Sequence, residues 1–543
     1  MNIGEKIALL RATSGLSQES LAERLSVSRQ SVSKWEMSLA MPQIDKVIEL
    51  CDIFGVSADV LLRDEIEIED KRKKEKRESP SGNKYFGTDG FRGEVGVDLT
   101  SYQAFRIGRF LGWYYSSRLS GCKRHNYRPR VVIGKDTRRS SYTLEYSIAA
   151  GLAASGADAH ILHVTTTPSV SYVTRFDGFD CGVMITASHN PFYDNGIKIL
   201  NKYGEKLDDD TTQLIEAYID GDYGRLGLDS DIPYALGENI GSIVDYVAGR
   251  NRYVGYLISL ASYSYRGLRI GLDTANGASW MIAKAVFEAL GATTYMTGAE
   301  PDGLNINRGY GSTHIETLAR LVREERLDVG FAFDGDADRC IAVSRGGRVV
   351  DGDGILYVLA KRLAERGALD KNTVVTTVMS NTGLYRALRE VGIDYRTTKV
   401  GDRFVYECMQ EGGYNIGGEQ SGHIILKKYA TTGDGILTAI MMCEEMCERH
   451  ASLDELVRPL TLLPQRTKNI RVCDKSRVAR DPEVLSAANR VAEKIGEDGR
   501  ILLRESGTEP VIRIMVEAVS EELCDEYIEE VRSVIEERGY ITE

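Results

Sequence analysis

The sequence V-G-F-A-F-D-G-D-A-D-R, residues Val329–Arg339, joins a short apolar run to three alternating aspartates. Such a run, bounded by turn residues, is typical of a buried strand. In an extended loop after it, the side chains of Asp334, Asp336 and Asp338 would point to one side. Three convergent carboxylates repel unless a cation neutralises them, and oxygen-only ligands favour a hard ion such as Mg²⁺. These residues therefore predict a buried strand that ends at a magnesium site.

Two other interpretations compete with a magnesium site. A calcium-binding EF-hand loop also alternates aspartates, but it needs glycine at its sixth position and glutamate at its twelfth. The residues that follow Asp334 supply neither, so we set the EF-hand aside. An exposed acidic turn without a metal is the simpler alternative, and the local sequence leaves it open.

On both sides of this stretch, the chain repeats the pattern of an apolar strand beside a helix. We expect strands over residues 130–134, 159–164, 182–186, 269–273 and 373–377, and a helix over residues 144–156. This alternation predicts an α/β fold with mixed or parallel sheets covered by helices. Functional loops should then lie at the carboxyl ends of strands.

A serine in a small-residue loop follows the apolar strand at residues 182–186. The loop reads T-A-S-H-N-P-F-Y-D-N-G-I-K and places His189 and Lys198 near Ser188. A serine hydroxyl beside an imidazole and an ammonium is a candidate nucleophile or phosphoryl carrier. The alternative, an Asn-Pro turn capped by serine, is equally compatible with the local sequence.

Four further segments carry polar groups in glycine-rich turns. G-G-E-Q-S-G-H at residues 417–423 brings together a carboxylate, a hydroxyl and an imidazole, which are groups that can hold sugar hydroxyls. R-E-S-G-T-E-P-V-I-R at residues 504–513 offers two arginines, two hydroxyls and free amides, a plausible phosphate cradle. K-Y-F-G-T-D-G-F-R-G at residues 84–93 and G-K-D-T-R-R-S-S at residues 134–141 are compatible with ordinary loops.

The composition excludes several classes of protein. Of the 543 residues, 27% are charged and 42% hydrophobic, with a formal net charge of −12, which argues against a general nucleic-acid or membrane coat. Nine dispersed cysteines without a C-x-x-C pair argue against a zinc ribbon and suit reduced thiols. Because we find neither a signal region nor an apolar run of ~18 residues, we expect a cytoplasmic protein that does not bind membranes.

Taken together, four signatures resemble those of the α-D-phosphohexomutase superfamily: T-A-S-H-N-P, D-G-D-A-D-R, G-E-Q-S-G-H and R-E-S-G-T-E-P. The resemblance covers residues 84–543 and implies three similar mixed-sheet α/β domains followed by a C-terminal α+β domain. We expect these domains at residues 84–236, 237–342, 343–463 and 464–543.

Within the superfamily, the chain looks most like the branch that acts on glucosamine phosphates. Supporting strings are G-T-D-G-F-R-G, Y-D-N-G-I-K, P-D-G-L-N-I-N and T-T-K-V-G-D-R, together with the glutamine in G-E-Q-S-G-H. The resemblance implies interconversion of glucosamine 6-phosphate and glucosamine 1-phosphate through a 1,6-bisphosphate, which feeds UDP-N-acetylglucosamine and cell-wall synthesis. Activity on mannose or glucose phosphates is the alternative.

The resemblance also assigns roles to residues. Ser188 would carry the phosphoryl group, and Mg²⁺ would bind Asp334, Asp336, Asp338 and an oxygen of the Ser188 phosphate. Arg92, Lys198 and Arg339 would surround the transferring group, and Lys198, His189 or His423 would take the proton of the sugar hydroxyl. Substrate contacts would come from Glu419, Ser421, His423, Lys399, Arg504, Ser506, Gly507, Thr508 and Arg513.

The sequence of residues 1–64 predicts a bundle of short helices, with Ser17 and Ser28 as N-caps and a helix over Ile44–Phe54. They resemble the Cro/C1-type helix-turn-helix family, with a recognition helix over Arg29–Glu36. We expect residues 65–83, which are mostly charged, to form a linker. The side chains that would reach bases or phosphates are Arg29, Gln30, Ser31, Ser33 and Lys34.

A DNA-binding module of this kind usually acts as a dimer, so we expect a homodimer that binds DNA. Two alternatives remain open for the module and for the whole chain. The helices can serve dimer contacts alone, or the chain can be a transcription regulator whose mutase domains only sense a phosphosugar.

Overall fold

The computed structural model describes residues 3–13, 16, 18–36, 40–54, 56, 58–62, 84–87, 89–119, 128–496, 498–505 and 511–542. Two compact units divide the chain, Met1–Glu78 and Ser79–Glu543. The predicted linker, Ser17 and the loop residues Ser506, Gly507 and Thr508 lie outside the described residues. No helix in the described part of the chain combines the length and the apolar character that crossing a membrane requires.

The first unit is an all-helical bundle, as predicted. Its helices are α1 (Ile3–Thr13), α2 (Gln18–Arg24), α3 (Arg29–Glu36), α4 (Ile44–Phe54) and α5 (Ala58–Leu62). The bundle core contains Leu21, Val32 and Trp35 at helical spacing. Ser28 caps α3 as expected, because its Oγ accepts a hydrogen bond from the Ser31 amide at 3.1 Å.

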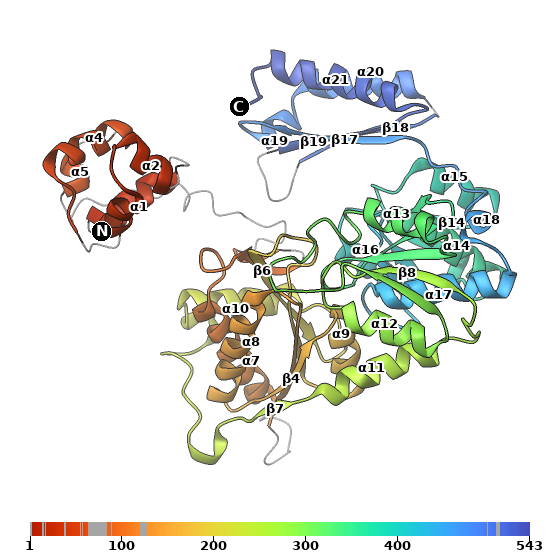
Figure 1. Ribbon diagram of the computed structural model, residues 1–543, viewed down its shortest axis with the longest axis horizontal. Helices are drawn as coiled ribbons and strands as arrows, with labels where there is room; N and C mark the ends of the chain where they lie inside the picture. The colour runs from red at the N-terminus through yellow and green to blue at the C-terminus, as the bar shows by residue number, and fades with distance from the viewer. Residues whose placement is uncertain are drawn as a thin grey trace. The chain divides into compact units, whose positions relative to one another are not determined.

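The second unit begins with a seven-stranded mixed sheet in the order β1-β2-β6-β5-β3-β4-β7. Its strands are β1 (Phe86–Gly87), β2 (Gly90–Glu94), β3 (Arg130–Lys135), β4 (Asp158–Val164), β5 (Cys181–Ile185), β6 (Asp194–Asn201) and β7 (Ile243–Asp245). Its helices are α7 (Ser101–Leu119), α8 (Arg139–Ala154), α9 (Thr167–Phe176) and α10 (Asp209–Asp220). Helices α7, α8 and α10 cover one face and α9 the other (Figure 1).

A five-stranded sheet follows, in the order β12-β11-β10-β8-β9. Its strands are β8 (Arg269–Asp273), β9 (Thr293–Thr297), β10 (Val329–Phe333), β11 (Cys340–Ser344) and β12 (Val349–Val350). Its helices are α11 (Val247–Ser259), α12 (Trp280–Ala289) and α13 (Glu316–Glu324). Strand β10 is parallel to β8 and antiparallel to β11, so the aspartate loop connects two paired strands.

The third sheet has four strands in the order β14-β13-β15-β16. They are β13 (Thr373–Thr377), β14 (Asp394–Thr398), β15 (Ile416–Gly418) and β16 (Ile424–Leu426). The accompanying helices are α14 (Gly352–Glu365), α15 (Thr382–Glu390), α16 (Asp402–Gly412), α17 (Gly435–Arg449) and α18 (Leu453–Leu456). One continuous apolar core joins this sheet to the five-stranded sheet, which holds the second and third domains together.

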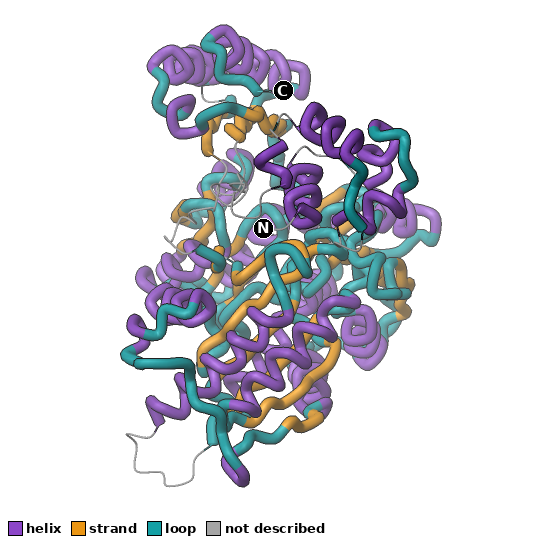
Figure 2. Tube along the Cα trace, turned by 90° about the vertical axis from the view of Figure 1, so that its left-hand side faces the viewer, coloured by secondary structure: helices purple, strands orange, loops and turns teal. Residues whose placement is uncertain are grey.

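The last sheet is antiparallel, in the order β17-β19-β18. It comprises β17 (Gln465–Arg471), β18 (Arg500–Glu505) and β19 (Val511–Glu517), with α19 (Lys475–Val478), α20 (Pro482–Ile495) and α21 (Glu521–Glu537). Helices α20 and α21 lie side by side on one face (Figure 1). Around the three earlier sheets, helices enclose the strands (Figure 2). The predicted fold class is therefore confirmed.

The sheets differ from the expected segments at two edges. The first sheet takes β7 from beyond residue 236, because Ile243–Asp245 pair with β4. The second sheet continues past residue 342 to β12, because β12 pairs with β11.

Candidate functional site

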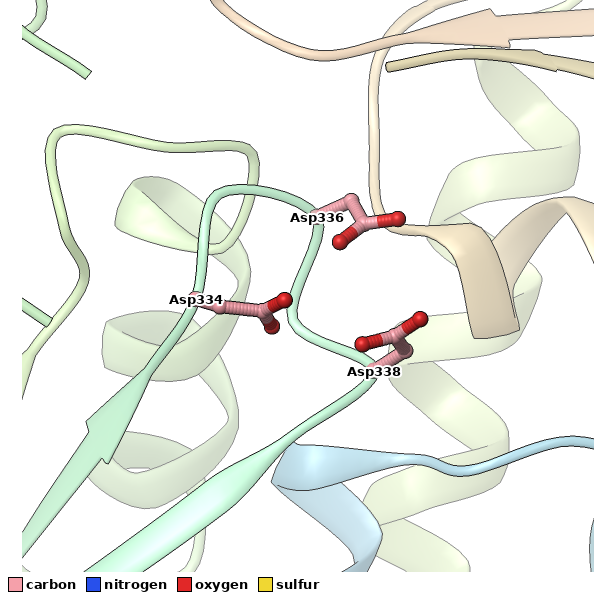
Figure 3. Close-up of side chains that lie close together, drawn as sticks. All are labelled: Asp334, Asp336 and Asp338. Carbon is pink, nitrogen blue, oxygen red and sulfur yellow. The ribbon is translucent and has the colours of Figure 1, made fainter. Parts of the chain in front are cut away.

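The three aspartates of the β10–β11 loop come together. One carboxylate oxygen from each of Asp334, Asp336 and Asp338 lies within 4.8 Å of the others, and all three residues are buried. Figure 3 shows the carboxylates facing a common point. The loop is a turn rather than the extended segment that we expected, because Ala337 has a left-handed φ of 56°. The turn still produces the predicted convergence.

These carboxylates are only partly satisfied by hydrogen bonds. The Oδ1 atoms of Asp336 and Asp338 are buried and have no hydrogen-bond partner. Burial, followed by the charges of Asp338 and Asp336, raises the pKa of Asp334 well above its ordinary value. Buried oxygen atoms without partners are costly unless a cation or a donor satisfies them. The donor set therefore fits a hard divalent metal ion.

Ser188 lies against the aspartates at the carboxyl end of β5. Its hydroxyl donates to Asp334 Oδ2 at 2.5 Å, and His189 Nδ1 lies 3.3 Å from the Ser188 Oγ atom. The residue is 1% exposed and has a φ of 51°, in the left-handed region that is costly for a side chain larger than glycine. The surrounding structure must therefore hold this conformation.

Two residues that the sequence analysis did not assign hold the serine loop. Arg138, fully buried, donates from its Nε to Asp136 at 2.8 Å. Its other nitrogens donate to backbone oxygens of the loop: Ser188 at 3.0 Å, Asn190 at 2.9 Å, Asp194 at 3.0 Å and Pro191. Asn307 Nδ2 also donates to the Ser188 oxygen, at 2.8 Å. Both residues lie in segments quoted above, G-K-D-T-R-R-S-S and P-D-G-L-N-I-N, but their contacts are long-range and leave no local signal.

Lys198 on β6 joins the aspartate loop to the first domain. Its Nζ lies 2.9 Å from Asp336, 3.2 Å from Asp338 and 3.1 Å from Asp89. Burial lowers the pKa of this ammonium, but the three carboxylates outweigh burial and hold the pKa well above its ordinary value. Lys206 is a second cation in the network, 2.9 Å from Asp89. Thr167 adds a hydroxyl that donates to Asp336 Oδ2 at 2.5 Å.

The remaining cations expected around the transferring group lie next to this network. Arg92 forms an ion pair with Asp89, and Arg339 Nε lies 3.9 Å from Asp338 Oδ1. Burial, reinforced by the charges of Arg339 and Arg92, lowers the pKa of His189 to about 4. His189 is therefore neutral at pH 7, within hydrogen-bond distance of the Ser188 hydroxyl.

The groups expected to bind the sugar differ in how far they are buried. Glu419 is 9% exposed and accepts a hydrogen bond from the Gly401 amide at 2.9 Å. Burial raises the pKa of this carboxyl. Ser421 and Lys399 are exposed. These three residues lie in the third domain, on a sheet separate from that of Ser188.

His423, on the same loop, faces the aspartates. It is 3% exposed, and its Nε2 accepts from the Gly433 amide at 3.0 Å. Its Nδ1, which then carries the ring proton, lies 3.7 Å from Asp338 Oδ2. A cavity of about 410 Å³ also borders Asp338, Lys198 and Asp402 at this junction of the first and third domains.

The expected phosphate-binding residues lie in the fourth domain. Arg504 on β18 pairs directly with Arg513 on β19, and both are half-buried. Burial and the charge of Arg513 lower the pKa of the Arg504 guanidinium. Like charges at directly opposite positions of a sheet repel, so an anion bound between them would relieve the repulsion.

In the helical unit, α3 carries the side chains expected to reach DNA. Arg29, Gln30 and Lys34 are exposed, while Ser31 and Ser33 are half-buried. Arg29 forms an exposed ion pair with Glu19, 3.1 Å apart, which a phosphate can replace at low cost.

Family comparisons assign all of these domains. Residues 83–224, 251–347, 351–462 and 468–534 match domains I, II and III and the C-terminal domain of phosphoglucomutase/phosphomannomutase. Residues 7–61 match a helix-turn-helix family. Four such domains in this order, around a buried serine and three aspartates, define the class of protein as a phosphohexomutase, an isomerase.

Individual relatives show to which family within this class the chain belongs. The chain is 60% identical over 457 residues to the phosphoglucosamine mutase of Lachnospira eligens, covering 84% of this chain and 99% of the relative. It is 56% identical over 458 residues to that of Lachnoclostridium phytofermentans, with the same two coverages. The chain therefore belongs to the phosphoglucosamine mutase family, which confirms the resemblance.

Solved structures share the fold. A phosphoglucomutase/phosphomannomutase family protein from Burkholderia thailandensis superimposes with a TM-score of 0.68 at 23% identity, over 83% of this chain and 97% of that one. N-acetylphosphoglucosamine mutase from Aspergillus fumigatus, solved with GlcNAc-6P and magnesium, gives a TM-score of 0.58 at 17% identity, over 84% and 96%.

Proposed function

We propose that this chain interconverts glucosamine 6-phosphate and glucosamine 1-phosphate through a phosphorylated Ser188. The observation that carries the proposal is the contact of the Ser188 hydroxyl with Asp334 inside a buried group of three carboxylates. The sugar follows from the relatives, which are named phosphoglucosamine mutases. The phosphohexomutase class leaves mannose and glucose phosphates as competing substrates.

Mg²⁺ would be held by Asp334, Asp336, Asp338 and an oxygen of the Ser188 phosphate. The partnerless Oδ1 atoms of Asp336 and Asp338 support this assignment, and so does the magnesium in the Aspergillus fumigatus structure. The ion would supply charge neutralisation for the transferring group, since phosphoserine carries about −1.5 to −2 charge at pH 7. Lys198, Arg92 and Arg339 would add positive charge around it.

Transfer would occur in two opposite halves. The C1 hydroxyl oxygen of glucosamine 6-phosphate forms a bond to phosphorus while the bond from phosphorus to Ser188 Oγ breaks. The hydroxyl proton leaves to a protein base, and Ser188 Oγ gains a proton, giving glucosamine 1,6-bisphosphate. The intermediate then reverses its orientation. Ser188 takes the C6 phosphoryl group, which leaves glucosamine 1-phosphate and restores phosphoserine.

The proton acceptor remains one of three residues. We rank Lys198 first by its position in the family motif, and its Nζ contacts two of the aspartates. The three carboxylates around Lys198 hold its pKa well above the ordinary value, so the ammonium neutralises the transferring group and must lose a proton before it can act as the acceptor. His189 and His423 are the other candidates, and His189 lies 3.3 Å from the Ser188 hydroxyl.

The remaining residues would hold the substrate in either orientation. The phosphate that does not react would lie between Arg504 and Arg513, whose mutual repulsion favours an anion. The other groups assigned to the substrate are Glu419, Ser421, His423 and Lys399 on the sugar loops, and Ser506, Gly507 and Thr508 in the fourth domain.

The helical unit would add DNA binding through α3, in a homodimer. The exposed Arg29, Gln30 and Lys34 support this, together with the match to the helix-turn-helix family. A regulator that only senses a phosphosugar is the competing function. A sensor has no need of a phosphoryl carrier, whereas this chain keeps Ser188 beside Asp334.

A coupled assay tests the proposal. Metal-loaded, prephosphorylated chain should convert glucosamine 6-phosphate with a higher kcat/KM than mannose 6-phosphate or glucose 6-phosphate. The Ser188→Ala variant should be inactive on all three. If the wild-type chain turns over none of them while it still binds DNA, the regulator function is correct instead.

A further inference from the structure

The glutamine of the sugar-binding loop is directed toward the fourth domain. Gln420 Nε2 donates to Gln465 Oε1 at 2.8 Å, and Gln465 is the first residue of β17. The backbone oxygen of Gln420 accepts from the Gly352 amide at 2.9 Å. Its side-chain amide and its carbonyl are therefore both engaged by neighbouring elements, whereas the residues beside it, Glu419 and Ser421, are those assigned to the sugar.

The fourth domain makes hydrogen bonds to the third domain at the short segment that leads into α15. Gln465 Nε2 donates to the Met379 oxygen at 3.3 Å, and Arg500 donates to the Ser380 oxygen at 2.5 Å. Glu517, fully buried, accepts from the Thr382 amide at 3.0 Å. Gln465 thus contacts both the attachment segment and the sugar loop, and it connects the two.

The backbone of the sugar loop is in close contact with the start of α14. A Cβ added to Gly352 would lie 2.0 Å from the Glu419 oxygen and 2.9 Å from the Gln420 oxygen. The loop therefore rests directly on the first turn of α14. A displacement of Gln465 would be passed through its hydrogen bond to Gln420, and from there to the neighbouring Glu419.

We propose that Gln420 and Gln465 form a latch that couples the position of the fourth domain to the sugar-binding loop. The latch holds the fourth domain close enough to retain the bisphosphate while it reverses its orientation. A single hydrogen bond between two neutral amides suits this task, since it is weak enough to break and reform in each cycle. The inference rests on the proposed mutase function, and it makes Gln420 and Gln465 positioning residues.

A competing role for Gln420 is direct recognition of the sugar amino group. In that case Gln420 alone would set the affinity for the substrate, and substitution of Gln465 would leave that affinity unchanged. The two roles therefore predict different patterns for a pair of variants, Gln420→Met and Gln465→Met, which keep the length of the side chain and remove its amide.

The first test measures how often the intermediate escapes. Prephosphorylated full-length chain is given labelled glucosamine 6-phosphate, and the released 1,6-bisphosphate is counted per product formed. Each single variant should raise escape about three- to tenfold, as expected for one lost hydrogen bond, and the double variant should do no more than either single one. A matched control is Gln213→Met, whose amide bonds only an exposed arginine. A raised KM in Gln420→Met without increased escape, together with a silent Gln465→Met, overturns the latch.

The second test needs no activity, so its outcome is separate from that of the proposed function. Hydrogen–deuterium exchange is followed in the peptide covering β17 of the unliganded full-length chain. Exchange should be several-fold faster in both Met variants than in wild type and in Gln213→Met. Unchanged exchange in both variants contradicts the latch, even if the chain proves to be an active mutase.

Discussion

Ser188 depends on residues that lie far from it in the sequence. Its left-handed backbone and nearly complete burial are maintained by donors from two other loops, Arg138 and Asn307. Its hydroxyl contacts Asp334, which belongs to a different domain. The proposed phosphoryl carrier therefore needs no motion to meet the proposed metal site, because both loops are already in contact.

Replacing Asp338 by Asn should weaken magnesium binding. The change removes one negative charge and one carboxylate oxygen from a residue whose Oδ1 has no hydrogen-bond partner, so we expect the affinity for Mg²⁺ to fall by at least about tenfold. Titration of activity against Mg²⁺ concentration, together with calorimetry, measures the change. Asp370→Asn, an exposed position, is the matched control. An unchanged magnesium affinity in Asp338→Asn argues against this site.

Replacing Arg138 by Lys should misplace the serine loop without affecting the metal. A lysine ammonium cannot reproduce the fork that donates to Asp136 and to the loop carbonyls. We expect kcat to fall about 10²-fold, since small displacements of a reacting group have effects of this size. Magnesium affinity should stay unchanged. Arg139→Lys, the exposed neighbour, serves as the control, and equal losses in both variants would point to general instability.

At the scale of elements, the sequence predicts strands more reliably than it predicts contacts. The strands at residues 269–273, 329–333 and 373–377 and helix α3 (Arg29–Glu36) have the predicted bounds. Apolar runs with clear turn signals specify them locally. The trio Asp334, Asp336 and Asp338 was also predictable, because its members share one loop.

The residues that support the site could not be predicted in the same way. Arg138, Asn307 and Thr167 contact the serine or aspartate loops across 50, 119 and 169 residues of sequence. The direction of Gln420 toward the fourth domain is likewise a property of the folded chain. Such contacts depend on which loops the sheets bring to one edge, and a single sequence does not encode that in any local pattern.

Replacing Gly335 by Ala should push the aspartate and serine loops apart. A Cβ at this position would lie 2.5 Å from the Ser188 backbone oxygen and 2.9 Å from Ile306 Cδ1. The Ser188 backbone on one side of this Cβ can move away only at a high energetic cost. We therefore expect a loss of stability of about 1–3 kcal/mol and a larger relative loss of kcat. Denaturant unfolding and steady-state kinetics measure the two effects. Gly367→Ala offers a control at a glycine with open space, although its positive φ adds strain of its own.

At the scale of the whole molecule, two units with different chemistry share one chain. The mutase relatives are covered over 99% of their length by 84% of this chain, and the helix-turn-helix match occupies residues 7–61. All described groups proposed for catalysis lie within Ser79–Glu543. Catalysis should therefore not require the helical unit.

Deleting residues 1–78 should separate the mutase activity from the proposed DNA binding. We expect kcat/KM of the mutase reaction to stay within about twofold of the value for the full-length chain. Changes at sites that share no contacts usually have independent effects. A gel shift seen with the full-length chain should disappear, and before deletion its affinity should fall steeply with salt, because phosphate contacts release counterions. A shift that survives the deletion would place DNA binding elsewhere in the chain.

The most direct measurement follows a labelled phosphoryl group through one turnover. The chain is prephosphorylated at Ser188 with labelled phosphate and mixed with unlabelled glucosamine 6-phosphate. The account predicts that the label leaves the protein and appears in glucosamine 1-phosphate, while the protein retains an unlabelled phosphate from the substrate. Label that stays on Ser188 while product forms, or that is released only as inorganic phosphate, would contradict transfer through this serine.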